Sequence, residues 1–372
     1  MSLAPRTPDL KANLGVNNGT FGTLLSTGSI GAIVMLLLGG QIVHRIGTKR
    51  AMQIGVTLLA LTCMVLSSTR SSFIFVIANI LAGAAISIFH IASSGHALHR
   101  QDQVEKVIIF RLHGSWSIGA ITSSAIAFLV ATNISIAWHV TTLMVVVWVL
   151  TIYVIKKLEP SFSPKPSGDD AYRITSIKQF KFKVNWFLTT GFFCASIVEV
   201  AITDWSVLFG REVMGMAQST SALNFLIYML GMIIGRFSIG WALKHGSEQF
   251  WIRRAGGFGG GGFVLLLLLS AALLETNKNL AYALNFLGFL VAGLGTSFIV
   301  PIFFSIAGRL SGGKNSLAVA QLSFVNSLLG FNSKLILAAI AQITSITVVL
   351  ITAGCLMALL FHFGKIGSNE RT

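Results

Sequence analysis

Charged side chains are scarce in this sequence. Asp, Glu, Lys and Arg make up only 10% of its 372 residues, whereas apolar residues make up 54%, and the mean hydropathy is +0.78. Soluble globular domains carry about 25% charged residues, so this composition excludes a soluble fold. It predicts a polytopic membrane protein.

Carboxylates are rarer than bases, with 12 Asp and Glu against 27 Lys and Arg, which gives a net charge of +15. In a soluble chain such an excess would suggest nucleic acid as a partner. Here the bases lie in the turns between apolar runs, where the positive-inside rule places them. Nucleic-acid binding is therefore not expected.

Cysteine is also rare, and its three copies lie far apart inside apolar runs, at Cys63, Cys194 and Cys355. Their spacing excludes a disulfide framework and the usual metal-ligand patterns. The glycine-rich segment 256–262 has no preceding strand and no Lys-Ser/Thr, so a phosphate loop is not expected either. We expect no enzyme, no catalytic residue, no metal and no cofactor.

Apolar runs of about 20 residues, long enough to cross a bilayer, recur along the whole chain. We expect spans at 20–38, 51–68, 73–98, 113–131, 136–155, 184–209, 219–241, 256–274, 280–307, 317–341 and 344–363. A polar, proline-containing segment, 156–183, separates five spans from six. It predicts a linker between an N-terminal bundle, 1–155, and a C-terminal bundle, 184–372.

The bases are distributed unequally between the two sets of turns. The turns on the side of Arg45 hold 20 of the 27 Lys and Arg residues, including the linker and the C-terminus, and the opposite side holds 5. The richer side is predicted to be cytoplasmic. We expect a multi-pass protein of the cell inner membrane whose linker and C-terminus are cytoplasmic.

A basic turn, GGQIVHRIGTKR at 39–50, lies between two of these spans. Gly40, Arg45, Gly47, Lys49 and Arg50 in it resemble the loop between the second and third helices of major facilitator superfamily transporters, G-x-x-x-D-R-x-G-R-[KR], although His44 replaces the aspartate. A second basic turn, GWALKHGSEQFWIRR at 240–254, follows about 200 residues later, also without the acid. Repetition at that spacing indicates two homologous halves.

Three further segments resemble the fucose-permease-like branch of that superfamily: RTPDLK at 6–11, HGSWSIG at 113–119 and EVAITDWS at 199–206. The resemblance implies an all-helical membrane fold with two pseudo-symmetric bundles around a central site, working by alternating access. It implies a monomer that carries a sugar-like solute and leaves proton symport open. It also places 6–11 at the outer end of a first helix, so either a helix precedes Met1 or the fold has about eleven spans instead of twelve.

Two carboxylates, Glu199 and Asp204, lie within a predicted span, where an acid costs about 2.5 to 3.5 kcal/mol and therefore faces a cavity or a partner. We expect Glu199 to serve substrate binding or proton coupling. Asp204 lies nearer the outer surface, so a helix-end role is its alternative. Lys334, at a depth of about 25 Å along its own span, is the expected partner of Glu199, with snorkelling as the alternative.

Polar residues also recur at helical spacing. Asn79, Ser87 and His90 lie on one face of the fourth helix of the family, which the resemblance implies lines the cavity. Tyr228 and Asn285 are further candidates for substrate contacts. The alternative is close packing between helices, which explains His90 less well than the others. The resemblance also implies a cytoplasmic gate, formed by Arg45, Gly47, Lys49, Arg50, His113 and Arg236.

The substrate stays open at this level. A fold of this kind is also compatible with export of drugs or other lipophilic compounds. The missing loop acids suggest a third alternative, a membrane sensor, a scaffold or a decaying remnant that no longer transports. No pattern in the sequence distinguishes the solute, the direction of transport or the coupling ion.

Overall fold

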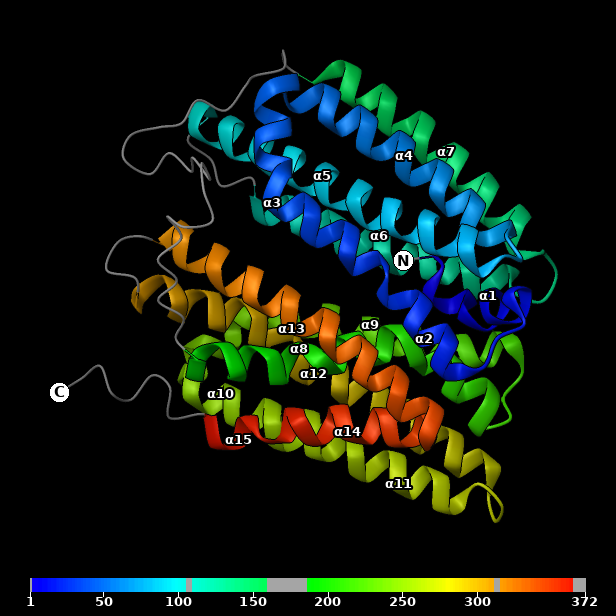
Figure 1. Cartoon of the computed structure of the whole chain (residues 1–372). Coiled ribbons are helices and arrows are strands. Elements are labelled where there is room, and N and C mark those ends of the chain that lie inside the picture. Colours follow the sequence, from blue (N-terminus) through cyan, green and yellow to red (C-terminus); the bar gives the residue numbers. More distant parts are fainter. Residues whose placement is uncertain (1, 105–108, 159–185, 311–314, 364–372) are drawn as a thin grey trace.

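The computed structural model describes residues 2–104, 109–158, 186–310 and 315–363. Within these residues every regular element is a helix (Figure 1). The first bundle contains η1 (Ala4–Arg6), α1 (Thr7–Leu14), α2 (Asn18–Ser26), α3 (Gly28–Ile46), α4 (Thr48–Ser68), α5 (Ser72–Val104), α6 (Ile109–Val130) and α7 (Ile136–Lys157).

The second bundle contains α8 (Trp186–Leu208), η4 (Phe209–Val213), α9 (Gln218–His245), α10 (Glu248–Arg254), η5 (Ala255–Gly262), α11 (Phe263–Leu273), α12 (Lys278–Leu310), α13 (Asn315–Ile343), α14 (Ile346–Ala358) and α15 (Leu360–Phe363). Each predicted span coincides with one helix or with consecutive helical segments, so the prediction of about eleven spans is confirmed. Within the described residues, eight of these are both long and apolar enough to cross a membrane by themselves.

Glycines bring two helices of each bundle into backbone contact. A Cβ atom added to Gly83 on α5 would lie 1.9 Å from the carbonyl oxygen of Gly28 on the neighbouring helix α3. In the second bundle, a Cβ added to Gly293 on α12 would lie 2.2 Å from the carbonyl oxygen of Tyr228 on α9. Small residues drive helix association in lipid because they let backbones approach. The same kind of contact therefore recurs in both halves.

The basic turn at 39–50 is built around Gly47, which ends α3 and precedes α4. Gly47 has φ +80°, a conformation that favours glycine, and its N–H donates to the carbonyl oxygen of Val43. The sharp turn positions Lys49, whose Nζ donates to the carbonyl oxygens of Lys156 and Leu158 at the end of α7. The turn is thereby fixed to the end of its own bundle.

Large apolar side chains are exposed on the outward faces of many helices. Phe73 on α5 is 74% exposed, Trp138 on α7 is 72% exposed and Phe237 on α9 is 73% exposed. A soluble protein rarely tolerates such surfaces, whereas a bilayer favours them. The exposed faces are therefore the lipid-facing surface.

Candidate functional site

Glu199 on α8 is the only acid that lies well inside a described membrane span and away from its ends. The Glu199 side chain is partly buried, and it interacts electrostatically with Arg236 on α9. From the first residues of these helices, Glu199 lies about 20 Å along α8 and Arg236 about 27 Å along α9, and the two helices run in opposite directions. A carboxylate and a guanidinium therefore lie within electrostatic range of one another inside the second bundle, although these two described side chains form no direct ion pair.

Tyr228 lies two turns from Arg236 on α9, and it interacts electrostatically with both Glu199 and Arg236. It is fully buried, and its hydroxyl is 3.1 Å from the hydroxyl of Thr296 on α12. In this conformation the Tyr228 side chain is inaccessible to a solute. Its role as a direct substrate contact stays a prediction.

Asn285 lies in a second buried polar group of the same bundle. Its Nδ2 donates to Oδ1 of Asn224 at 2.6 Å, and Asn224 in turn donates to the carbonyl oxygen of Ser206. Asn285 and Asn224 are both fully buried. The amide pair connects α12, α9 and α8, which is the packing alternative that the sequence left open.

Lys334 does not serve Glu199, so that prediction is wrong. Its Nζ lies 2.8 Å from Oδ2 of Asp204, and the two side chains are 22% and 13% exposed. The reason is how far along its helix each side chain lies. Because α13 begins at Asn315 and α8 at Trp186, Lys334 lies about 28 Å along its helix, level with Asp204 at about 27 Å rather than with Glu199.

Asn79 on α5 forms hydrogen bonds to the break between α2 and α3. Its Nδ2 donates to the carbonyl oxygens of Leu24 and Leu25 and to Oγ1 of Thr27. These groups lie where the first membrane helix is interrupted, and a buried carbonyl without a donor would be costly. The structure therefore gives Asn79 a structural task. Ser87 is partly buried and His90 is exposed, and their substrate contacts stay predictions.

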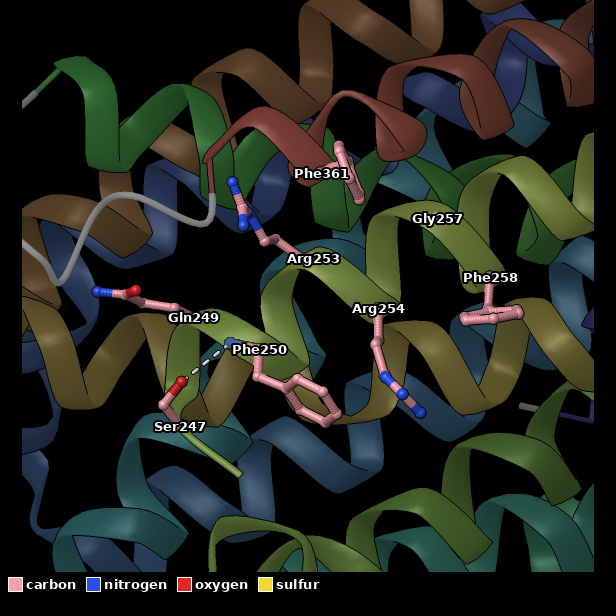
Figure 2. A pocket seen from close by; sticks show the side chains of 8 residues that line it. All are labelled: Ser247, Gln249, Phe250, Arg253, Arg254, Gly257, Phe258 and Phe361. Carbon is pink, nitrogen blue, oxygen red and sulfur yellow. Dashed lines mark hydrogen bonds between the residues drawn. The ribbon is translucent and has the colours of Figure 1, made fainter. Parts of the chain in front are cut away.

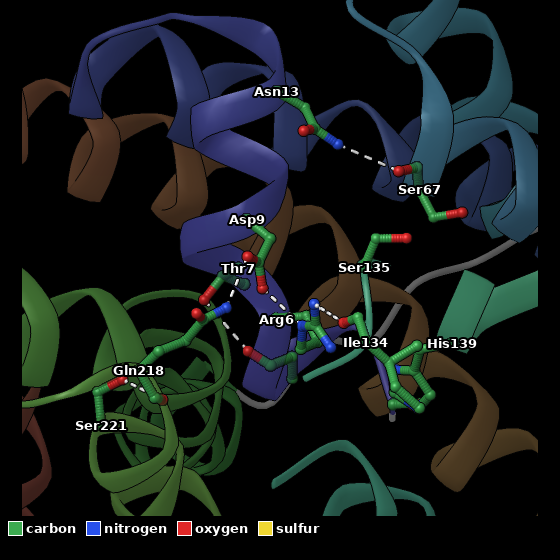
Figure 3. A network of polar contacts seen from close by, with 12 residues as sticks. Arg6, Thr7, Asp9, Asn13, Ser67, Ile134, Ser135, His139, Gln218 and Ser221 are labelled. Carbon is green, nitrogen blue, oxygen red and sulfur yellow. Dashed lines mark hydrogen bonds and ion pairs between the residues drawn. The ribbon is translucent and has the colours of Figure 1, made fainter. Parts of the chain in front are cut away.

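The two bundles are joined on the side of the N-terminus by a polar network that sequence analysis did not find (Figure 3). Arg6 pairs with Asp9 at 2.5 Å and donates to the carbonyl oxygen of Ile134. Gln218 at the start of α9 donates to the same Asp9 at 2.7 Å. Figure 3 shows Gln218 reaching Asp9 from the opposite bundle.

A second contact reinforces this junction. Lys11 pairs with Glu212 of the second bundle at 2.5 Å, and Asn18 also donates to Glu212 at 3.0 Å. The backbone N–H of Gly19 donates to Oε1 of Gln342 on α13. Residues 6–19 therefore close the two bundles together at this end. The partners are about 200 or more residues apart in sequence, and no sequence motif predicts that they meet.

The predicted cytoplasmic gate lies at the opposite end of the bundles. Arg45 and Arg50 are exposed there, and Lys49 is bonded to α7 of its own bundle. Arg236 is not at this surface but beside Glu199. The side chain of His113 lies outside the described residues. A gating role for this set stays a prediction.

Comparison with known proteins identifies the family. The family model "Major Facilitator Superfamily" matches residues 1–333. An uncharacterized MFS-type transporter from Yersinia pestis is 23% identical over 360 residues, which are 96% of this chain and 88% of the relative. The membrane protein MosC of Rhizobium meliloti is 24% identical over 306 residues, 82% of this chain and 70% of MosC.

Solved structures share the fold. A variant of the nucleoside transporter NupG superposes with a TM-score of 0.75 at 14% identity, covering 98% of this chain and 95% of NupG. A D-xylose-proton symporter superposes with a TM-score of 0.72 at 14% identity, covering 98% and 92%. Together with the paired helical bundles described above, the family match shows that this chain is a multi-pass membrane transporter of the major facilitator superfamily.

Proposed function

We propose that this transporter moves a small polar solute, sugar-like in its hydroxyl content, by alternating access, and that Glu199 couples the movement to protons. The observation that carries the proposal is the Glu199–Arg236 interaction inside the second bundle. An ionised acid in a membrane span is retained only where it has a partner or a function.

The chemistry of coupling follows from the pair. Desolvation by the surrounding helices opposes the ionised form of Glu199, and Arg236 offsets this in part, so the carboxylate stays charged only while Arg236 is near. If the solute or a movement of α9 separates them, the unpaired carboxylate in a medium of low dielectric constant becomes neutral by taking up a proton. A proton can then cross with the solute, and it is released when the pair re-forms.

The outer junction supplies the second half of the mechanism. Contacts of residues 6–19 with Glu212, Gln218 and Gln342 close the bundles at that end. We place the basic turns, the linker 156–183 and the C-terminus in the cytoplasm and the protein in the inner membrane, because 20 of the 27 Lys and Arg residues lie on that side. The described conformation is then closed toward the outside.

Uptake into reconstituted vesicles tests the proposal. A panel of pentoses, hexoses and nucleosides is offered with and without an inward proton gradient, since the two solved neighbours are named for a nucleoside and for xylose. We expect Glu199→Gln to reduce gradient-driven accumulation to the level of empty vesicles while exchange of labelled for unlabelled solute continues. Undiminished accumulation by Glu199→Gln would remove Glu199 from coupling.

The matched control is Asp204→Asn on the same helix. Asp204 lies five residues away and pairs with Lys334 outside the Glu199–Arg236 pair. We expect this variant to keep gradient-driven uptake within a few-fold of the unmodified protein. If both variants lose coupling equally, the effect is general damage to α8.

A lipophile exporter is the second candidate, because the described spans of the first bundle contain no Asp, Glu, Lys or Arg at mid-depth. The same vesicles distinguish it when they are loaded with a lipophilic dye. Dye efflux without uptake of any polar solute would favour export. If the vesicles show neither dye efflux nor uptake of a polar solute, a sensor or scaffold is favoured.

A further inference from the structure

A pocket of about 430 Å³ lies on the same side as the basic turns, away from the Glu199–Arg236 pair. It is lined by Ser247, Gln249, Phe250, Arg253, Arg254, Gly257, Phe258 and Phe361. Figure 2 shows these residues along α10, the beginning of η5 and α15. The pocket therefore belongs to the end of the second bundle and not to its interior.

The shape of the pocket follows from the helical spacing of its residues. Phe250 and Arg254 are four positions apart, and so are Arg253 and Gly257, so the four residues form two adjacent exposed stripes of the helix. Gly257 has no side chain, and an added Cβ would meet only Phe361 at 3.8 Å. The glycine leaves an open floor between the two arginines and the aromatic rings.

The charge of the pocket is positive. Arg254 lies over the ring of Phe250 at 4.3 Å and Arg253 lies over the ring of Phe361 at 5.4 Å. Within the described residues neither arginine forms an ion pair. The acid on the same helix, Glu248, is not part of the lining, and its Oε1 lies 3.5 Å from the hydroxyl of Ser305 on α12. Two guanidinium groups are thus available for an anion.

The surroundings of the pocket distinguish a lipid from a soluble anion. Phe258 at its edge is 69% exposed, and the following turns of the same membrane helix expose Leu265, Leu268 and Leu269. These apolar side chains continue from the arginines into the bilayer, and Leu265 lies about 16 Å further along the helix. A headgroup at the arginines would therefore have its acyl chains along this apolar face.

We propose that this pocket is a binding site for an anionic phospholipid, whose phosphate pairs with Arg254, whose acyl chains cover Phe258 and Leu265, and to which Arg253, directed to the other side of the helix (Figure 2), adds a nearby positive charge. Basic pockets beside membrane helices on the cytoplasmic side bind such headgroups, and guanidinium groups suit phosphate oxygens. The site secures the junction of α9 and α11 to the membrane surface.

Lipid binding to the full-length protein in detergent tests the proposal. Phosphatidylglycerol and phosphatidylcholine are added in defined amounts, and bound lipid is counted by native mass spectrometry. We expect phosphatidylglycerol to bind preferentially. Arg253→Gln combined with Arg254→Gln should weaken this binding by about 30-fold, the factor expected for two bases near an anionic lipid. Equal retention of the two lipids by the unmodified protein would overturn the proposal.

The chain offers a matched control at the end of α7. Lys156 and Lys157 are exposed on the same side, and Lys157 also lies over a ring, that of Tyr153, at 4.4 Å. Lys156→Gln combined with Lys157→Gln removes the same charge from residues that do not line this pocket, so binding should stay within about two-fold. An equal loss of phosphatidylglycerol binding in this variant would show that the lipid is held only by general electrostatic attraction to the basic surface.

Gly257→Leu tests the pocket itself because it fills the floor and keeps both arginines. We expect it to abolish preferential phosphatidylglycerol binding, while thermal unfolding without added lipid stays unchanged. Unchanged binding by Gly257→Leu would place the lipid elsewhere.

Inorganic phosphate serves as the soluble probe, and displacement of the lipid by millimolar phosphate would identify a site for a free anion and overturn the assignment to lipid.

Discussion

The two bundles share a fold but differ in what holds their interiors together. In the first bundle the described membrane helices meet through glycine and neutral hydrogen-bonding groups, such as Gly83 against Gly28 and Asn79 against the broken helix. In the second bundle, Glu199 interacts with Arg236 and Asp204 pairs with Lys334. Charge inside the membrane is concentrated in one half.

This difference indicates that the two bundles of the fold contribute differently to its electrostatics. A neutral bundle moves as a rigid body at no electrostatic cost, whereas a charged pair in a medium of low dielectric constant responds strongly to small displacements. We therefore expect the second bundle to be the half in which a proton or a polar solute changes the energy balance. The first bundle supplies a frame, and its residues 6–19 contact the second bundle at the end near the N-terminus.

Breaking the interior pair of the second bundle should have the largest effect. Arg236→Gln removes the cation that acts electrostatically on Glu199, and we expect a loss of up to about 5 kcal/mol in the free energy of unfolding, the cost of leaving a buried charge uncompensated, measured by titration with sodium dodecyl sulfate. Combining Arg236→Gln with Glu199→Gln should restore most of the loss. If Arg236→Gln were as stable as the unmodified protein, Arg236 would not stabilise Glu199 in the folded state.

Steric packing in the neutral bundle provides the next test. Gly83→Ala places a methyl group against a backbone oxygen at 1.9 Å, so α3 and α5 must separate, at a cost of up to about 3 kcal/mol. Gly95→Ala on the same helix is the control, since an added Cβ there meets nothing within 4 Å. Equal stability of the two variants would refute close packing through Gly83.

The outer pair of the second bundle should matter less than the interior pair. Asp204 and Lys334 keep partial exposure, so Lys334→Met should cost about 2 kcal/mol, between the values for exposed and buried pairs. The same detergent titration measures it, with the double variant carrying Asp204→Asn as the reference. A loss as large as that of Arg236→Gln would remove the distinction between the two pairs.

The smallest effect is expected at the junction between the bundles. Glu212→Gln weakens its contact with Lys11, which is partly exposed to solvent, so we expect about 0.5 to 1 kcal/mol. That shifts the ratio of outward-open to outward-closed molecules by about two- to five-fold. Pulsed electron resonance between labels at positions 133 and 276, with the native cysteines replaced, measures the shift. An unchanged distance distribution would show that this ion pair does not hold the junction.

Much of this architecture could be predicted from the chain alone. The eleven apolar runs and the basic turns predicted the membrane fold, because a bilayer imposes length and hydropathy on every segment that crosses it. The motifs at 6–11, 39–50, 113–119 and 199–206 predicted the family. The intramembrane position of Glu199 was also visible, because an acid in an apolar run stands out without any knowledge of its neighbours.

The partners of these residues were decided by the tertiary structure. Lys334 was matched to Glu199 from an estimated depth, but the true starts of α8 and α13 bring it to Asp204, and Arg236 is the cation that acts electrostatically on Glu199. The contacts of Lys11 with Glu212 and of Asp9 with Gln218 left no sign in the sequence. Hydropathy fixes which segments cross the membrane, whereas the rotation and depth of each packed helix decide which side chains meet.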